Sequence, residues 1–343
     1  MVSDMQGKKK ILIWTGVVFA IIAVAVGGYY WPSQKQQKPA VPVEKATYAI
    51  GSGLHRGPVY IAIEKGYFKN EGLNVTLQEY NTGKEALNAV IKGKADLSTS
   101  AETPIMLAAM RGEKIYVIAT LVDTDKDVVI VARKDRGISW PRGLKGKKIG
   151  VSIGTNGEFF MDAFLISHGI SRNEVEVVNL SPKEMIDALT KGEVDAVSTW
   201  NPHVIRLQKE LGAKGITFYG EGIYTETFNI SAARDFVHKK PETVKKVLRS
   251  LIRAVEFIRG NPDKSRGIIS NYIKMDEAMI GELWGIYHFK VTLDQSLLIT
   301  LENQARWAIK NRLTDETKVP NYLDFIYLDG LKAVKPEAVT IIR

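Results

Sequence analysis

Hydrophobic and polar positions follow the same order in two segments of this chain, residues 84–104 and 183–203. When the first is shifted by 99 positions (183 minus 84), a Lys-Glu pair, an alanine, a Lys-Gly pair and an aspartate coincide with their counterparts. In each copy, apolar residues at helical spacing are followed by a glycine, which is typical of a helix C-terminus. A short strand is expected next, at 95–97 and at 194–197. Two copies at so long a period do not make a stacked repeat protein, so the pattern predicts two similar α/β lobes in tandem.

Other apolar runs suggest how the chain moves between these lobes. The same shift places Ile50-Gly51 on Ile149-Gly150, each pair closing a short strand. The continuous apolar run at 128–133 is typical of a strand buried on both faces, and we expect it to carry the chain into the second lobe. The run at 228–232 predicts the return, so that two crossings form a hinge. Lobe one is therefore expected at 46–127 and 229–343, and lobe two at 128–228.

Helical patterns dominate after the return crossing. Apolar residues between 244 and 258 recur at intervals of three and four, and Pro241 suits the first turn of that helix. Further helices are predicted at about 262–273, 276–288 and 294–310. We expect these C-terminal helices to pack on lobe one and to support the hinge.

The N-terminal segment has the pattern of an export signal. Three lysines at 8–10 precede an uncharged stretch of 18 residues (11–28), and Tyr29, Tyr30 and Trp31 follow it. One interpretation is a cleaved secretory signal. The other, which the aromatic residues favour, is an uncleaved membrane anchor at 1–31 with a proline-containing linker at 32–45. Both interpretations export the rest of the chain, so we expect it at the periplasmic or extracellular side, attached to the inner membrane or soluble after cleavage.

Composition narrows the possible classes of function. The 343 residues are 45% apolar and 25% charged, as in ordinary globular proteins, and the net charge is +9. Six lysines against two acidic residues in 1–45 account for +4 of that charge, and no basic run with interleaved aromatics follows, which argues against nucleic-acid binding. There is no cysteine for a disulfide, a thiol nucleophile or a thiolate metal site.

Motifs of catalysis and of cofactor binding are weak or missing in the sequence. The five histidines are scattered without H-E-x-x-H, and no G-x-S-x-G occurs. Gly51, Gly53 and Gly57 form only a weak dinucleotide-like pattern. We therefore expect neither an enzyme nor a metal or cofactor site.

Residues 62–73 carry a resemblance to a known family. Their sequence, Ala-Ile-Glu-Lys-Gly-Tyr-Phe-Lys-Asn-Glu-Gly-Leu, resembles the A-x-x-K-G-Y/F-F-x-x-E-G-L stretch of substrate-binding proteins of ABC importers that handle sulfonates, taurine, nitrate and the pyrimidine precursor of thiamine. The Leu-Lys-Gly-Lys-Lys-Ile-Gly run at 144–150 and the Trp-Asn-Pro run at 200–202 are similar too. The resemblance covers about 46–313. It implies a type II periplasmic-binding clamshell, a monomer that captures a small solute and delivers it to a membrane permease. Pyrimidine-making enzymes of the family rely on a cysteine cluster, which this chain lacks.

Polar loops at the carboxyl ends of the predicted strands should meet in the cleft between the lobes. The first loop combines backbone N–H groups with a helix N-terminus, which favours an anion, and a tryptophan in another loop could stack on a planar ligand. Tight turns, a helix cap and a core tryptophan are the alternatives. The candidate ligand-binding residues are Ser52, Gly53 and His55; Thr99, Ser100, Glu102 and Thr103; Thr155, Asn156 and Gly157; Trp200 and Asn201; and Tyr224 and Thr227, with Glu226 between them as a further candidate.

The charge of the ligand remains open at this stage. Hydroxyls, amides and helix ends suit an anion such as a sulfonate or nitrate, or the anionic end of a zwitterion such as taurine. Glu102 and Glu158 would instead suit an ammonium or an aminopyrimidine, because an unpaired buried carboxylate beside a bound anion is costly. A membrane-anchored sensory domain that acts with a partner protein is a further alternative.

Overall fold

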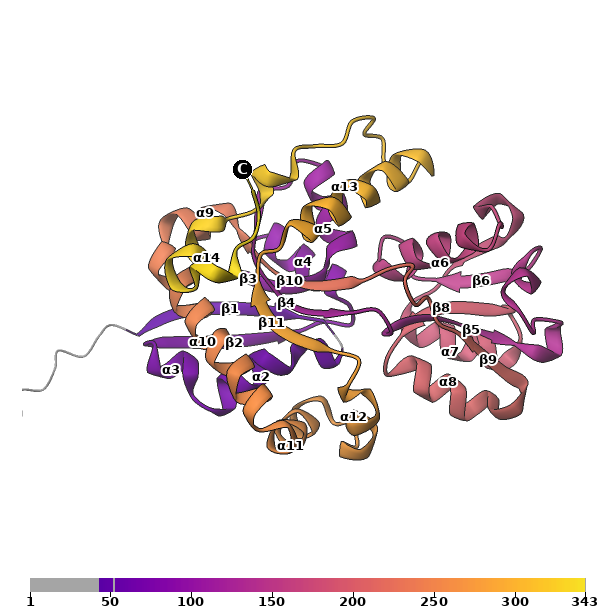
Figure 1. Cartoon of the computed structure of the whole chain (residues 1–343), viewed down its shortest axis with the longest axis horizontal. Helices are drawn as coiled ribbons and strands as arrows, with labels where there is room; N and C mark the ends of the chain where they lie inside the picture. The colour runs from indigo at the N-terminus through magenta and orange to yellow at the C-terminus, as the bar shows by residue number, and fades with distance from the viewer. Residues whose placement is uncertain (1–42, 52, 343) are drawn as a thin grey trace, which may run out of the picture. The chain divides into compact units, whose positions relative to one another are not determined.

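A computed structural model describes residues 43–51 and 53–342 of the chain (Figure 1). The expected membrane segment at 1–31, most of the linker and Ser52 lie outside these residues. Within the described part, no helix is both long enough and apolar enough to span a bilayer. Residues Val43–Arg343 make up one compact unit.

The first of two sheets has six strands in the order β11-β4-β10-β3-β1-β2. Strands β2, β1 and β3 run parallel, whereas β10 is antiparallel to both β3 and β4, and β11 is antiparallel to β4. The sheet and the helices on it form lobe one. Its strands are β1 (Glu44–Ile50), β2 (Leu73–Glu79), β3 (Leu97–Ala101), β4 (Ile115–Thr124), β10 (Glu226–Ala233) and β11 (His288–Thr292).

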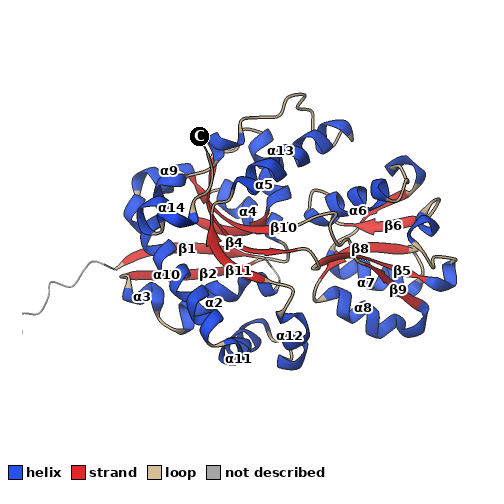
Figure 2. Cartoon of the chain, in the orientation of Figure 1, coloured by secondary structure: helices blue, strands red, loops and turns tan. Residues whose placement is uncertain are grey.

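The second sheet repeats this plan with five strands in the order β7-β6-β8-β5-β9 and forms lobe two. Three strands are again parallel, and a fourth, β5, is antiparallel to both of its neighbours. The chain passes from the first sheet to the second between β4 and β5, and it returns between β9 and β10 (Figures 1 and 2). The predicted two-lobed α/β fold with two crossings is confirmed. The strands are β5 (Val128–Arg133), β6 (Lys148–Val151), β7 (Glu176–Asn179), β8 (Ala196–Trp200) and β9 (Gly215–Phe218).

The internal repeat is real, but two of its expected details are wrong. Helices α4 (Gly83–Ile91) and α7 (Pro182–Lys191) match the prediction, and Gly93 and Gly192 both have positive φ at the helix ends. The strands that follow begin later than the predicted 95–97 and 194–197, because the small hydroxyl residues after them are buried within the sheets rather than in loops. The shift of 99 also aligns the first strands of the two lobes, β1 and β6, incorrectly. Tyr48 of β1 pairs with Leu97, whereas Ile149 of β6 pairs with Ala196, the repeat counterpart of Leu97.

The counterpart of Tyr48 is therefore Ile149, at a shift of 101 (149 minus 48) rather than 99. The two-residue error escapes a pattern search, because side chains two apart in a strand point to the same face.

The C-terminal helices cover lobe one, as predicted. Helix α10 packs on α2 (Gly57–Glu64), and α13 packs on α5 (Glu102–Met110). Three elements of this region were not predicted: β11, whose residues were assigned to the end of a helix or to none, and the helices α9 and α14. Besides α10 (Pro241–Gly260), the helices of this region are α9 (Arg234–Lys239), α11 (Pro262–Ile273), α12 (Glu277–Trp284), α13 (Gln295–Lys310) and α14 (Leu328–Val334).

The repeated aspartate has the same structural role in both lobes. The backbone N–H of Thr47 donates to Asp96 Oδ2 at 2.7 Å, and the backbone N–H of Lys148 donates to Asp195 Oδ2 at 2.9 Å. In return, the backbone N–H of Asp96 donates to the carbonyl of Thr47, and that of Asp195 donates to the carbonyl of Lys148. The side chain thus fixes the start of the central strand against the first strand of its lobe.

We expect Asp96→Ala and Asp195→Ala to destabilise the protein by similar amounts. A hydrogen bond to a charged group contributes about 1.5–3 kcal/mol, and each change removes one. Asp187→Ala, which removes only an exposed pair with Lys191, should cost less than about 0.5 kcal/mol. Thermal unfolding of the three variants checks this, and unequal effects of the first two changes would contradict the shared role.

Candidate functional site between the lobes

Three helices direct their N-termini at one small cavity between the lobes. Helices α4 and α5 belong to lobe one, and α6 (Asn156–Ser167) belongs to lobe two. The first residues of α4 and α6, and the residue before α5, all line the cavity. The first N–H groups of a helix have no partner within that helix, and the helix dipole makes this end positive. The convergence of three such ends favours an anion in the cavity.

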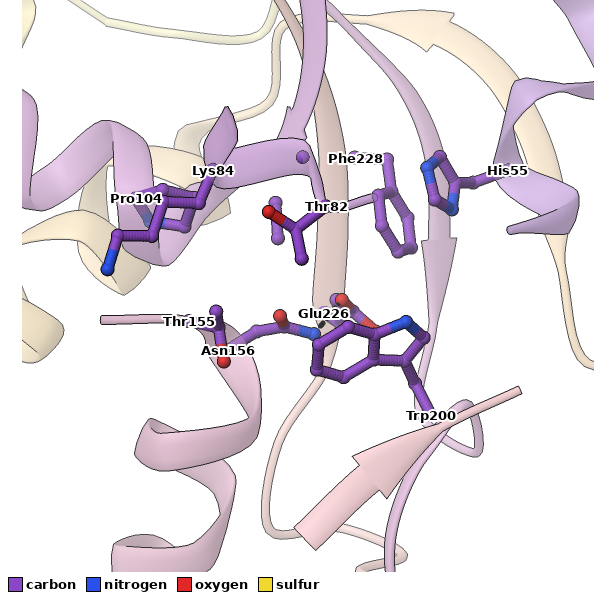
Figure 3. Close-up of a pocket in the computed structure, with 11 residues that line it drawn as sticks. His55, Thr82, Lys84, Pro104, Thr155, Asn156, Trp200, Glu226 and Phe228 are labelled. Atoms are coloured by element: carbon purple, nitrogen blue, oxygen red, sulfur yellow. Dashed lines mark hydrogen bonds between the residues drawn. The ribbon is translucent and has the colours of Figure 1, made fainter. Parts of the chain in front are cut away.

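The cavity has a volume of about 30 Å³. One water molecule needs about 10–15 Å³ on this measure, so the space takes a group of only a few non-hydrogen atoms. Side chains of both lobes surround this small space (Figure 3). The residues that line the cavity are His55, Thr82, Gly83, Lys84, Ala101, Pro104, Thr155, Asn156, Trp200, Glu226 and Phe228.

Lys84 supplies the positive charge of the cavity wall. Its Nζ donates to the carbonyl oxygen of Ile153 at 2.8 Å, a contact from lobe one to lobe two. Gly154 permits this approach, because its φ is +74° and a Cβ there would lie 2.8 Å from Nζ. Burial, with a smaller contribution from Arg111, lowers the pKa of Lys84, whereas the Glu158 carboxylate raises it. An anion bound beside Lys84 would stabilise the ammonium form.

Glu226 supplies a carboxyl group on the other side of the cavity, beside Trp200 (Figure 3). It is 2% exposed and accepts a hydrogen bond from the side-chain amide of Asn156, across the lobes. Its second oxygen, Oε2, has no hydrogen-bond partner among the described residues. Burial first, then the nearby Asp127 and Glu102, raise the pKa of Glu226 well above its ordinary value.

Aromatic rings form a third part of the wall. The imidazole of His55 stacks on the ring of Phe228, with 3.7 Å between centroids and an interplanar angle of 5°. Neither ring nitrogen of His55 has a partner among the described residues, and burial followed by the charge of Arg56 lowers its pKa well below the usual value. His55 is therefore neutral near pH 7. The imidazole of His55 also lies close to the backbone at residue 53. This position requires glycine, because φ is +131° and a Cβ there would lie 2.6 Å from the imidazole.

Of the residues predicted from sequence, His55, Thr155, Asn156 and Trp200 line the cavity. Five others lie near it but form contacts elsewhere. The Thr99 hydroxyl pairs with Tyr48, the Gly157 carbonyl accepts from Ser198, Asn201 donates its N–H to Asp127, and Tyr224 and Thr227 both donate to Glu102. Ser100 lies inside β3 and Thr103 lies in the first turn of α5, and both are buried. Gly53 lies against the imidazole of His55.

The two glutamates expected to favour a cation are already occupied. Glu102 accepts hydrogen bonds from Tyr224, from the N–H and hydroxyl of Thr227, and from Gln304 at 2.8 Å. Glu158 accepts from Arg172 at 2.6 Å and from the N–H of Gly154 at 2.7 Å. The carboxyl on the cavity wall with an unpartnered oxygen is Glu226, which the sequence indicated together with Tyr224 and Thr227 just before the return crossing.

The residues at the start of helix α4 were not predicted to belong to the site. Thr82 accepts a hydrogen bond from the N–H of Glu85 and caps α4, and Ser181 caps α7 in the same way with Glu184. This Ser/Thr-x-x-Glu pattern is a signal of a helix start. It begins two residues before the repeat, at Thr82, so a longer repeat would have included Thr82 and Gly83. Lys84 is the first residue of the repeat but was not predicted as a site residue.

An outer cavity of about 190 Å³ adjoins the first and shares Lys84 and Pro104 with it. Leu87, Leu107 and Leu313 make most of its wall apolar, and Arg111 contributes a second cation. Lys84 thus stands between the two cavities. Among the described residues, no group of three or more His, Asp and Glu side chains is placed to hold a metal ion.

With this geometry in place, comparison with known proteins identifies the class. The NMT1/THI5-like family model matches residues 55–265, and the chain belongs to that family. It is 28% identical over 202 residues to the taurine-binding periplasmic protein of Escherichia coli, covering 57% of this chain and 61% of the relative. It is 26% identical over 279 residues to a Bacillus subtilis protein named for binding aliphatic sulfonates, covering 80% and 81%.

Solved structures show the same fold. The alkanesulfonate-binding protein SsuA of Xanthomonas axonopodis superposes with a TM-score of 0.74 at 17% identity, covering 84% of this chain and 99% of that one. The family also contains enzymes: a pyrimidine phosphate synthase of Aspergillus parasiticus is 28% identical over 222 residues, 61% of this chain and 64% of the relative. The fold alone therefore does not separate binding from catalysis.

The buried carboxyls near the crossings should make stability depend on pH. Burial raises the pKa of Asp127 to about 6, against hydrogen bonds from Tyr287 and Asn201 that lower it. A raised carboxyl pKa means that the folded state holds the proton more tightly than the unfolded state, so this group's contribution to stability falls as pH rises from about 4 to about 6. The loss is on the order of 3 kcal/mol.

We expect Asp127→Asn to remove that loss, because an asparagine oxygen can accept from both donors without ionising. The melting temperature of the variant, relative to the unmodified protein, should be higher at pH 7.5 than at pH 4.5. Differential scanning calorimetry at both pH values measures the difference. An equal difference at the two values would show that Asp127 does not titrate in this range.

Proposed function

We propose that this protein is the extracytoplasmic solute-binding component of an ABC importer, and that it captures a small zwitterion between its lobes. The observation that carries the proposal is the interlobe cavity, with Lys84 and the N-termini of α4 and α5 on one side and Glu226, bonded to the first residue of α6, on the other (Figure 3). An anionic group fits the first side and an ammonium the second. Membership of the family and the taurine- and sulfonate-binding relatives support this assignment.

The size of the inner cavity limits the solute. A molecule such as taurine has its sulfonate and ammonium only two carbons apart, and it can reach both sides of a small cavity. Longer apolar chains on the anionic group would have to extend past Lys84 into the outer cavity, along Leu87 and Leu107. Closure of the lobes around the solute, followed by delivery to a membrane permease, completes the proposed role.

An aminopyrimidine is the second candidate for the ligand. The Glu226 carboxyl lies beside the ring of Trp200, so an aromatic amine could stack on the indole and donate to the carboxyl group. The phosphate-synthase relatives make a compound of this class. Helix N-termini and Lys84 would then remain without an anion, which is why we prefer the zwitterion.

A thermal-shift screen tests the proposed function. The full-length protein in detergent micelles is heated with taurine, ethanesulfonate, nitrate or 4-amino-5-hydroxymethyl-2-methylpyrimidine. A ligand at 100 times its Kd stabilises the folded state by about 2.7 kcal/mol, which is a measurable rise in melting temperature. We expect taurine to give the largest rise. If none of the four shifts the melting temperature, the proposed function is wrong; a response to the pyrimidine alone would select the second candidate.

Removing each charge should affect the probes differently. Lys84→Met should weaken taurine and ethanesulfonate alike, roughly 30-fold or more, because it removes a partly buried charge that meets the anion. Glu226→Gln should weaken taurine by a similar factor and ethanesulfonate little. Lys183→Met is the matched control, since Lys183 is the repeat counterpart of Lys84 but is exposed and does not line the cavity. Titration calorimetry measures the affinities, and equal losses for Lys84→Met and Lys183→Met would refute the placement of the anion.

A further inference from the structure

Three buried carboxyl groups gather where the chain crosses between the lobes. Asp127 lies directly before β5, Glu226 opens β10, and Glu102 opens α5. Their exposed fractions are 2%, 2% and 0%. The charges of Asp127 and Glu102 both act on Glu226. Such a group of carboxyls is costly to ionise together in a protein interior.

Two of the three are compensated by donors. Glu102 has four hydrogen bonds, and Asp127 accepts from the Tyr287 hydroxyl at 2.6 Å and from the N–H of Asn201 at 3.1 Å. Glu226 has a single described donor, the amide of Asn156; the residue lines the cavity, and its Oε2 is buried without a partner among the described residues. Glu226 is therefore the carboxyl of the three that is least able to carry a charge.

No described cation offsets Glu226. The titratable and charged groups around it are Glu102 with its partner Tyr224, Asp127 with its partner Tyr287, and, across the cavity, His55 and Lys84. His55 is neutral, and the ammonium of Lys84 donates to the carbonyl of Ile153. An isolated carboxylate in such surroundings takes up a proton rather than remain charged. Before a solute binds, Glu226 is a neutral acid.

We propose that the cationic nitrogen of the solute binds at Glu226 and displaces its proton, so that capture releases one proton to the solvent. The O–H bond of the Glu226 carboxyl breaks, the proton passes to water and buffer, and the solute keeps all protons of its ammonium or amidinium. The ion pair that forms supplies the missing partner of Oε2. This inference rests on the proposed function, and it defines the ligand class as solutes with a cationic nitrogen.

Proton release makes affinity depend on pH. Where one proton is released per solute, Kd falls tenfold for each unit of rising pH. The range extends from the pKa that Glu226 has in the complex up to its raised pKa in the free protein. A solute without a cationic nitrogen leaves Glu226 protonated, so its affinity should not follow this slope.

Titration calorimetry in several buffers tests the proposal directly. The full-length protein in detergent micelles is titrated with taurine at pH 7 in phosphate, HEPES and Tris, whose ionisation enthalpies differ. The slope of the observed binding enthalpy against the ionisation enthalpy gives the number of protons released. We expect close to one for taurine and close to zero for ethanesulfonate.

Two variants separate Glu226 from its neighbours. Glu226→Gln should bring the taurine slope close to zero, and because the carboxyl is already neutral before binding, the change should leave the fold intact. Asp127→Asn keeps both of its hydrogen bonds and is the matched control, with a slope still close to one. A second measurement without variants is the Kd for taurine between pH 5.5 and 8, which should fall in the unmodified protein.

The outcomes distinguish the two levels of the argument. Taurine that binds without proton release at pH 7, and with a Kd independent of pH, would overturn the inference and leave the proposed function standing. Binding of ethanesulfonate but not of taurine would overturn the inference and the zwitterion, while keeping solute capture. If no probe binds, the proposed function fails and the inference fails with it. If Asp127→Asn abolished the dependence of the taurine binding enthalpy on the buffer and Glu226→Gln preserved it, the released proton would come from Asp127. That result would also refute the proposal.

Discussion

Polar groups meet across the boundary between the two lobes, and each of them must find a partner when it leaves water. Lys84 of lobe one meets a carbonyl of lobe two, and Asn156 of lobe two meets Glu226 on the returning strand. Farther along the boundary, Trp307 on α13 donates to Asp162 on α6 at 2.8 Å. A buried polar group without a partner costs about 1–3 kcal/mol. Closing this boundary is therefore favourable where each group finds its complement. At the cavity, Glu226 Oε2 and both ring nitrogens of His55 have none among the described residues.

The duplicated fold places its two halves in contact but does not make them equivalent at the cavity. Lobe one contributes residues at the starts of α2, α4, α5 and β10, whereas lobe two contributes the start of α6 and the end of β8. Helix α7, the counterpart of α4, has its first turn away from the cavity, and Lys183 there is exposed. Duplication accounts for the scaffold, but the two opposite charges at the cavity, Lys84 on α4 and Glu226 on β10, both come from lobe one.

The sequence predicts the scaffold well because its signals are local or periodic. The two crossings, the repeated helix and its glycine, and the C-terminal helices each follow from runs of apolar residues or from a helix end. The displaced start of β3 shows the limit: Ser98 and its neighbours read as a loop, yet the strands on both sides bury them in the sheet. Tertiary pairing of this kind is not visible along the chain.

The site is predicted less completely, for a different reason. Residues that follow a strand or precede a helix were found, as with Thr155 and Trp200, because loop position is a local property. Whether a carboxyl is satisfied depends on donors far away in sequence: Glu102 is occupied by Gln304, and Glu158 by Arg172, while Glu226 has one amide. The three glutamates look alike in the sequence, and only the count of their partners identifies the one that faces a ligand.

That count also explains why a carboxyl can serve as a selective site in so polar an interior. If Glu226 were fully hydrogen-bonded like Glu102, a solute's ammonium would gain little by replacing existing donors. If it were fully ionised before binding, the lobes could not close over it without a counter-ion, because the neighbouring carboxyls act against its charge. A neutral acid with one free oxygen avoids both problems: it permits closure, and it offers a new ion pair only to a partner that brings positive charge. Selectivity for a cationic nitrogen thus arises from what the protein leaves unsatisfied at one position rather than from an additional contact.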